Sequence, residues 1–197
     1  METAIDLFQA IAGESGMGEP RDQNRIQLVD PRHVTGKTRR LLGQVRAKLG
    51  FVPNLFRALA NAPVALEGYL NFSAALAGGA LDDKIREQIA LAVAESNLCG
   101  YCLSAHVFLG QRAGLTSDEI ANAIRARASD PKIDAILKLA RNIIVQRAEI
   151  SDKDLQQARA AGLSDGEFIE TVANVALNIF MNYVSHAARL SIDFPQN

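Results

Sequence analysis

The chain has 197 residues, of which 48% are hydrophobic and 22% are charged. This composition is typical of a folded globular protein and excludes a largely disordered chain. The formal net charge of -1 at pH 7 gives no electrostatic reason to expect nucleic acid as a partner. The length predicts one compact unit of ordinary domain size.

The sequence predicts an N-terminal arm followed by one helical domain. Residues 1–33 form the predicted arm, with a short helix at about 3–12 and then a Gly-, Pro- and charge-rich surface segment. Residues 34–197 are predicted to be helical throughout, because Ala and Leu dominate and β-branched runs are short. We therefore expect an all-α fold. Helix-stopping signals recur at Gly50, Pro63, Ala77-Gly78-Gly79, Gly114, Pro131 and Gly162.

The sequence predicts neither a secretory signal nor a membrane span. Glu2 and Asp6 stand where a signal peptide would carry positive charge. The longest unbroken apolar run of the central region, Ile89 to Ala94, is far shorter than the ~20 residues that cross a bilayer. We expect a cytoplasmic protein that does not act at a membrane, in which thiols stay reduced and two cysteines serve chemistry rather than a permanent cross-link.

The stretch ESNLCGYCLSAHVFLG holds both cysteines of the chain, Cys99 and Cys102, and a histidine at position 106. Poor helix formers predict a break near 97–98 and a new helix from Cys99. Both cysteines would then lie in a first helical turn, where free N–H groups and the helix dipole stabilise a thiolate. Cysteines three residues apart on a helix have Cα atoms ~5–6 Å apart, which allows a disulfide to form and open.

The spacing of these residues predicts a division of roles. His106 is four residues from Cys102, or ~6 Å along a helix, but seven residues, or ~10 Å, from Cys99. We therefore expect Cys102 to be the attacking thiolate, Cys99 the resolving thiol, and His106 a base that acts directly or through a water. If the chain reverses near residue 98, Glu87 meets His106 and orients it. The alternative is that Glu87 pairs with a neighbouring cation in solvent.

Other interpretations of the CGYC motif fit less well. A covalent haem site requires a histidine directly after the second cysteine, where Leu103 stands, and a thioredoxin-type motif follows a strand. A zinc site would need a long-range ligand such as His186. Inert core cysteines remain an alternative, although they do not explain the clustering with His106. We favour a redox pair that needs no metal and no organic cofactor.

The C-terminal third of the sequence predicts further helices. Three similar openings predict three successive helix starts, at Thr116 or Ser117 with Glu119, at Ser151 with Asp154, and at Ser164 with Glu167. The last helix, at about 165–190, is apolar on nearly every face, so we expect it in the core or in a subunit interface.

A shift of the chain by 80 residues suggests an internal helical repeat as a hypothesis. This shift places Glu87 on Glu167 and His106 on His186. For His186 itself we expect a core or interface position rather than a role as a second catalytic base.

The order Glu87, eleven residues, Cys99-Gly100-Tyr101-Cys102, three residues, His106 resembles a known signature. It is similar to the E-x11-C-x-x-C-x3-H pattern of the alkylhydroperoxidase D / carboxymuconolactone decarboxylase superfamily. The flanking segments GFVPNLFRALANAP and VALNIFMNYVSHAARLSIDFP are similar to its branch of uncharacterised peroxidase-related proteins.

This resemblance implies an alkylhydroperoxidase D-like helical bundle that assembles into trimers or hexamers. It implies a thiol-dependent reduction of hydroperoxides in which Cys102 is peroxidatic, Cys99 resolves, and Glu87 and His106 activate the thiol. The implied reductant is a lipoyl group or a small dithiol protein. Tyr101 stands where mycobacterial peroxidases of the family have an extra histidine, and we expect its ring to pack instead.

The functional expectation is a peroxidase-like oxidoreductase that cycles between a Cys99/Cys102 dithiol and disulfide. One alternative is a lactone decarboxylase of the carboxymuconolactone type, whose acid-base chemistry has no use for paired cysteines. A second is a non-catalytic redox sensor. A sensor oxidises once, whereas an enzyme consumes peroxide continuously while reductant is supplied.

Overall fold

The computed structural model describes residues 24–195, so the expected helix at 3–12 lies outside the described residues. Within this part of the chain all regular structure is helical, which confirms the predicted all-α class. The helices are α2 (Gly36–Leu49), α3 (Asn54–Leu59), α4 (Pro63–Leu76), α5 (Asp83–Ser96), α6 (Gly100–Arg112), α7 (Ser117–Ile124), α8 (Pro131–Val145), α9 (Asp152–Ala160) and α10 (Asp165–Ala188). None of these described helices is both long enough and apolar enough to cross a bilayer.

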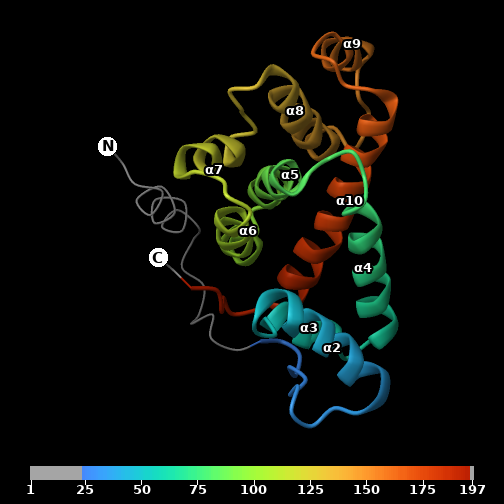
Figure 1. The fold of residues 1–197 in the computed structure, drawn as a ribbon, viewed down its shortest axis with the longest axis vertical. Coiled ribbons are helices and arrows are strands. Elements are labelled where there is room, and N and C mark those ends of the chain that lie inside the picture. Colours follow the sequence, from blue (N-terminus) through green and yellow to red (C-terminus); the bar gives the residue numbers. More distant parts are fainter. Residues whose placement is uncertain (1–23, 196–197) are drawn as a thin grey trace.

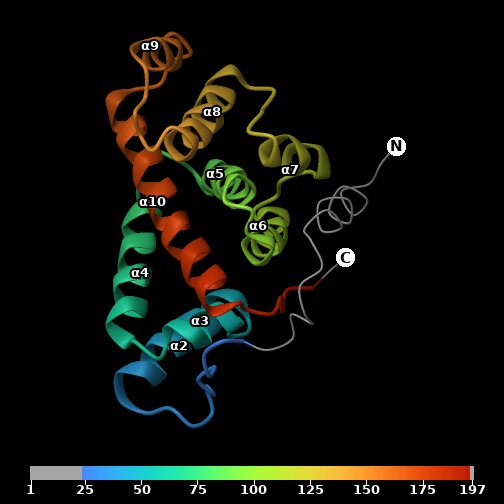
Figure 2. The ribbon, with the colours of Figure 1, turned by 180° about the vertical axis from the view of Figure 1, so that it is seen from behind.

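The long helix α10 organises the molecule. It runs from α9 at one end to α2 and α3 at the other, with α4 beside it (Figure 1). The view from behind shows α5 and α8 packed against α10, with α6 and α7 farther along the same layer (Figure 2). α5 lies at the centre, because it packs on α6, α7, α8 and α10. Its segment from Ile89 to Ala94 is accordingly buried, at 2% exposure or less.

The helix boundaries follow local chemistry that the sequence shows. Thr116 and Ser164 each begin a helix with a complete capping box, and Ser151 accepts from Asp154 N–H at the start of α9. Gly50 ends α2 in the left-handed conformation, with a φ of 91°. Two predicted helix stops were wrong: Pro63 begins α4 and Pro131 begins α8, because proline is tolerated at N1, and Asp130 caps the second of these helices. The three openings are therefore not successive.

The expectation that the last helix is apolar on nearly every face needs a correction. The buried side of α10 is largely polar, and two of its large apolar side chains, Ile169 and Tyr183, are more than 60% exposed. Burial of the polar side chains is tolerated because most of them are satisfied by the helix itself: Asn174 donates to Glu170 O at 2.8 Å, and Asn178 donates to Asn174 O at 2.9 Å. The buried polar residues of α10 are Thr171, Asn174, Asn178, Asn182 and Ser185.

The structure does not support the hypothesis of an internal repeat. Glu87 and His106 lie on two neighbouring helices, α5 and α6, and meet. Glu167 and His186 lie near opposite ends of the single helix α10, so that a rise of 1.5 Å per residue separates them by ~28 Å. The two pairs are therefore not structurally equivalent.

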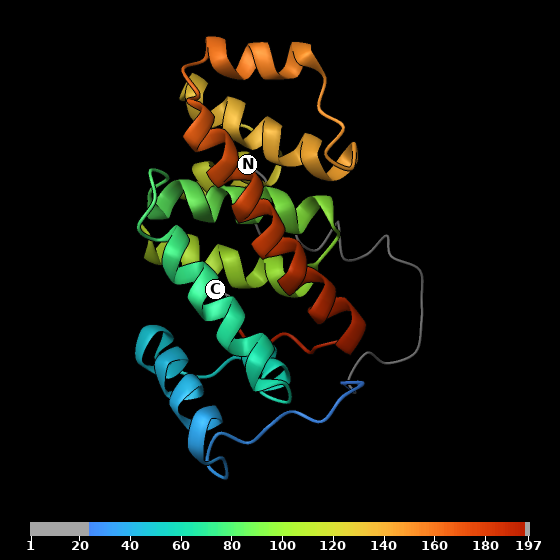
Figure 3. The ribbon, with the colours of Figure 1, turned by 90° about the vertical axis from the view of Figure 1, so that its right-hand side faces the viewer.

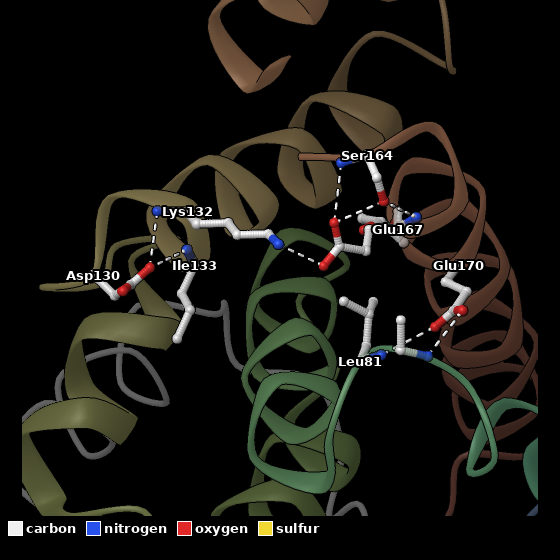
Figure 4. A network of polar contacts seen from close by, with 9 residues as sticks. Leu81, Asp130, Lys132, Ile133, Ser164, Glu167 and Glu170 are labelled. Atoms are coloured by element: carbon white, nitrogen blue, oxygen red, sulfur yellow. Dashed lines mark hydrogen bonds and ion pairs between the residues drawn. The ribbon is translucent and has the colours of Figure 1, made fainter. Parts of the chain in front are cut away.

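Carboxylates at the start of α10 hold the neighbouring elements in place (Figure 4). Glu170 accepts from the backbone N–H groups of residues 80–81, at 3.0 and 3.1 Å, and so fixes the segment that leads into α5. A Cβ at Gly79 would come too close to this carboxylate, so the glycine leaves room for the side chain where these hydrogen bonds hold it. Lys132 and Glu167 form an ion pair of 2.6 Å that joins α8 to α10. The helix that carries Glu87 is thus anchored at its N-terminal side.

Candidate functional site

The chain reversal between α5 and α6 places both cysteines. Leu98 adopts a left-handed conformation, with a φ of 53°, and the N–H of Cys99 donates to Ala94 O at 2.8 Å. Cys99 is the N-cap of α6, so it precedes the first turn in which we expected it. Its sulfur accepts from the backbone N–H of Cys102 at 3.3 Å. Both residues are free cysteines with 2% exposure, and the predicted break near 97–98 is confirmed.

The expected contact between Glu87 and His106 is confirmed. α5 and α6 lie side by side (Figure 3), and Glu87 Oε2 is 2.8 Å from His106 Nδ1. Their side chains are 23% and 17% exposed, so this pair is the more accessible part of the site. A carboxylate can only accept, which assigns the proton to Nδ1 and leaves Nε2 as the basic nitrogen. The imidazole therefore has the tautomer that a general base needs.

The ionisation of the cysteine pair differs from the sequence-based expectation. A hydrogen bond from the Cys102 thiol to Cys99 lowers the pKa of Cys99 to about 6, helped by the Cys102 N–H and by Ser185, although burial opposes this. The same hydrogen bond raises the pKa of Cys102, and burial adds to the increase. The resting dithiol thus carries its thiolate on Cys99, because the N-cap position collects both donors.

This assignment predicts how the reduced protein titrates. Since the folded pKa of Cys99 is lowered to about 6, its thiolate is present above that pH and is lost as the pH falls through it. Cys102 keeps its proton well into the alkaline range. Ultraviolet thiolate absorbance should therefore report one thiolate per chain at neutral pH, whereas the denatured chain should titrate both thiols near ~8.5. A folded protein without a thiolate at pH 7 would contradict the assignment.

A group of polar residues from α10 borders the cysteines on a side that the sequence interpretation missed. The side chains of Asn182 and Ser185 lie close enough to Cys102 to favour its ionised form and so lower its pKa, and Ser185 does the same for Cys99. Both residues are buried, at 0% and 4% exposure. The signal that could have indicated them is the recurrence of Asn and Ser at positions 174, 178, 182 and 185, one helical face of an otherwise apolar segment.

His186 follows this group and does not lie in the core, whereas the interface position that we gave as the alternative stays a prediction. It is exposed, and its Nε2 is 3.0 Å from the backbone oxygen of Asn97. Its charge favours the thiolate of Cys99. Among residues 24–195, the structure gathers no three His, Cys, Asp or Glu side chains in a manner that could hold a metal ion.

Tyr101 packs as expected and also forms hydrogen bonds. Its ring meets the ring of Phe194 edge-on, with 5.6 Å between centroids. Its hydroxyl donates to Asp193 Oδ1 at 2.8 Å and accepts from the N–H of Leu55 at 3.1 Å. Tyr101 thus connects the start of α6 to α3 and to the C-terminal segment.

The fold and the site together define an all-α protein with a candidate two-cysteine redox centre. The profile of the carboxymuconolactone decarboxylase family matches residues 63–146, which include the cysteines and the Glu–His pair. The match confirms the resemblance to the alkylhydroperoxidase D / carboxymuconolactone decarboxylase superfamily. No curated protein sequence matches the chain.

Solved structures share this fold. An uncharacterised peroxidase-related protein from Silicibacter sp. TM1040 superposes with a TM-score of 0.77 at 24% identity, over 90% of this chain and 96% of its own. A peroxidase-related protein with an alkylhydroperoxidase D core, from Ralstonia eutropha JMP134, gives 0.74 at 24% identity, over 89% and 94%. The debrominase Bmp8, solved in complex with 2,3,4-tribromopyrrole, gives 0.72 at 18% identity, over 87% and 94%. At these identities the likeness establishes the fold.

Proposed function

We propose that the chain is a thiol-dependent peroxidase that reduces hydroperoxides through a disulfide cycle of Cys99 and Cys102. The observation that carries this proposal is the hydrogen-bonded cysteine pair at the start of α6, one turn from a histidine that a carboxylate orients. A nucleophile, a base and a group that orients the base are the parts that such chemistry needs. Resemblance to peroxidase-related structures supports it.

The first step forms a sulfenic acid on Cys102. His106 Nε2 takes the thiol proton, directly or through a water, and the sulfur attacks one oxygen of the hydroperoxide. The O–O bond breaks, the departing alkoxide receives a proton, and an alcohol leaves. A base is needed because the hydrogen bond to Cys99 and burial hold Cys102 in its protonated form.

The second step closes the disulfide. The Cys99 thiolate attacks the Cys102 sulfur, the S–O bond breaks, and hydroxide leaves as water after it accepts a proton. The lowered pKa of Cys99 suits this role, since a resolving sulfur must itself be a nucleophile. An external dithiol, of lipoyl or small-protein type, then reduces the disulfide and becomes a disulfide itself. No organic cofactor or metal takes part in the proposed cycle.

The test is continuous consumption of an organic hydroperoxide and of hydrogen peroxide, with dihydrolipoamide or a reduced dithiol protein as donor. Many equivalents of peroxide per chain support the proposal, and the Cys99→Ser, Cys102→Ser double variant is the matched control. Consumption of one equivalent that then stops in the presence of every donor would favour a redox sensor. Release of carbon dioxide from a carboxymuconolactone, independent of both cysteines, would favour the decarboxylase alternative.

We propose that the protein functions as a homo-oligomer. Exposed apolar side chains gather on two helices that pack against each other, α4 and α10, and exposed apolar surface of this kind marks interfaces. They are Val64, Phe72, Ile169, Phe180 and Tyr183. Light scattering at micromolar concentration should give a multiple of 21.3 kDa, with a trimer or hexamer expected from the resemblance. A mass near that of one chain would contradict the proposal.

A further inference from the structure

The side chain of Asn182 is fully buried and half satisfied. Its Oδ1 accepts from Asn97 Nδ2 at 2.9 Å, whereas no acceptor among the described residues completes a hydrogen bond with its Nδ2. The two other buried asparagines of α10, Asn174 and Asn178, donate their amides to backbone oxygens of the same helix. Of these three, Asn182 alone keeps a free donor, and a buried free donor is costly unless a group is present to receive it.

The neighbours of Asn182 fix the direction of that donor. Asn97 lies directly after α5, and its backbone oxygen pairs with His186 Nε2 at 3.0 Å. Asn97 is therefore held at both its backbone and its side chain, and it locks the carbonyl end of the Asn182 amide. The amide nitrogen is left without a partner at the other end of the side chain, close enough to Cys102 to favour its ionised form. Ser185, one turn later on the same buried face, faces both sulfurs.

The chemistry of the cysteine pair requires donors at this place. Both cysteines are 2% exposed, so bulk water does not solvate an anion that develops on their sulfurs. Glu87 and His106 handle a proton, but the carboxylate of Glu87 is itself negative and does not stabilise a second anion. Donors that are fixed before the reaction and excluded from water stabilise developing charge most strongly.

We propose that Asn182 Nδ2, with the Ser185 hydroxyl as a second donor, forms an anion hole for the sulfur of Cys102. It stabilises the thiolate before attack and the oxygen of the sulfenate after attack, whereas the Glu87–His106 pair transfers the proton. The part that concerns the sulfenate rests on the proposed function, whereas the part that concerns the thiolate requires no peroxide.

The experiment uses the full chain in a Cys99→Ser background, so that Cys102 is the one sulfur able to react. Asn182→Ala and Ser185→Ala are compared with Asn178→Ala, the matched control, because Asn178 is a buried amide on the same helix that donates to its own helix. Two rates are measured for each protein: alkylation by iodoacetamide across pH, and a single oxidation by an organic hydroperoxide. Circular dichroism melting confirms that each variant is folded.

Asn182→Ala should slow both reactions of Cys102 by about 10- to 10³-fold and move its alkylation profile to higher pH. Ser185→Ala should slow them less, and Asn178→Ala should leave them unchanged. Wild-type rates in the Asn182→Ala variant would overturn the proposal. If that variant does not fold, an unchanged alkylation profile in Ser185→Ala overturns it instead. If Asn182→Ala slows alkylation but the Cys99→Ser parent does not react with hydroperoxide, the anion hole is upheld and the proposed peroxidase function is refuted.

Discussion

Replacement of Cys102 by serine is expected to abolish the first oxidation by hydroperoxide. The reason is that Cys102 alone lies one helical turn from His106, whose Nε2 can take its proton. Cys99 carries the more stable thiolate, yet a low pKa also lowers the intrinsic nucleophilicity of a sulfur. Trapping of sulfenic acid, read by mass spectrometry, measures the outcome.

The matching variant, Cys99→Ser, should behave differently. Cys102 would still oxidise, but its sulfenic acid would lack an intramolecular partner and would persist, over-oxidise or join another subunit. If the trapped adduct forms on Cys99 in Cys102→Ser as readily as on Cys102 in Cys99→Ser, the two roles are assigned wrongly. This outcome is a genuine alternative because the lowered pKa of Cys99 supplies a thiolate at neutral pH.

Loss of the Glu87–His106 pair should have the next largest effect. Glu87→Gln removes the carboxylate that holds His106 Nδ1 at 2.8 Å, and His106→Gln removes the base. Each should slow the first oxidation of Cys102 by roughly 10²- to 10⁴-fold, the range of general base catalysis. Stopped-flow measurement of a single turnover under an excess of hydroperoxide gives the rate.

Glu95→Gln is the control for this pair. Glu95 lies on the same helix α5 and is partly buried, which raises the pKa of its carboxyl, but it does not contact His106. Cys102 of the Glu95→Gln variant should oxidise at the wild-type rate. The slow variants should still form the disulfide under a stronger oxidant, since both sulfurs remain. An equal loss in Glu87→Gln and Glu95→Gln would indicate general damage to the helix instead of a role for the pair.

The sequence carries the local features of this fold almost completely. Capping residues such as Thr116 and Ser164 act within four residues of themselves, so the sequence alone suffices to place most helix starts. The contact between Glu87 and His106 was also predictable, because two helices joined by a tight reversal align residues at similar distances from the turn. Pro63 and Pro131 were misread because proline can stop a helix and can also stand at its first position, as it does in α4 and α8.

Features that depend on distant segments could not be predicted in the same way. Asn182 lies 80 residues after Cys102, and no local pattern joins them. The ionisation of the cysteines was also missed, because it depends on which sulfur receives the hydrogen bonds of its neighbours, and helix spacing alone favours Cys102. The polar face of α10 was missed for a similar reason: the helix itself satisfies the amides of Asn174 and Asn178, so their burial does not require a polar partner.

The hydrogen bonds of Tyr101 bear on any attempt to redesign this protein. The phenol joins Asp193, and that carboxylate also accepts from the backbone N–H of Asn54 at 2.7 Å. Position 101 is therefore part of the seam that closes the C-terminal segment over α3, where Phe51 and Phe194 also meet. Replacement of Tyr101 by histidine, to imitate a proton relay, would remove the hydrogen bonds of the phenol to Asp193 and Leu55 and so weaken the packing of the C-terminal segment. Engineering of the CGYC motif therefore has to include the C-terminal segment with Asp193 and Phe194, which packs against Tyr101.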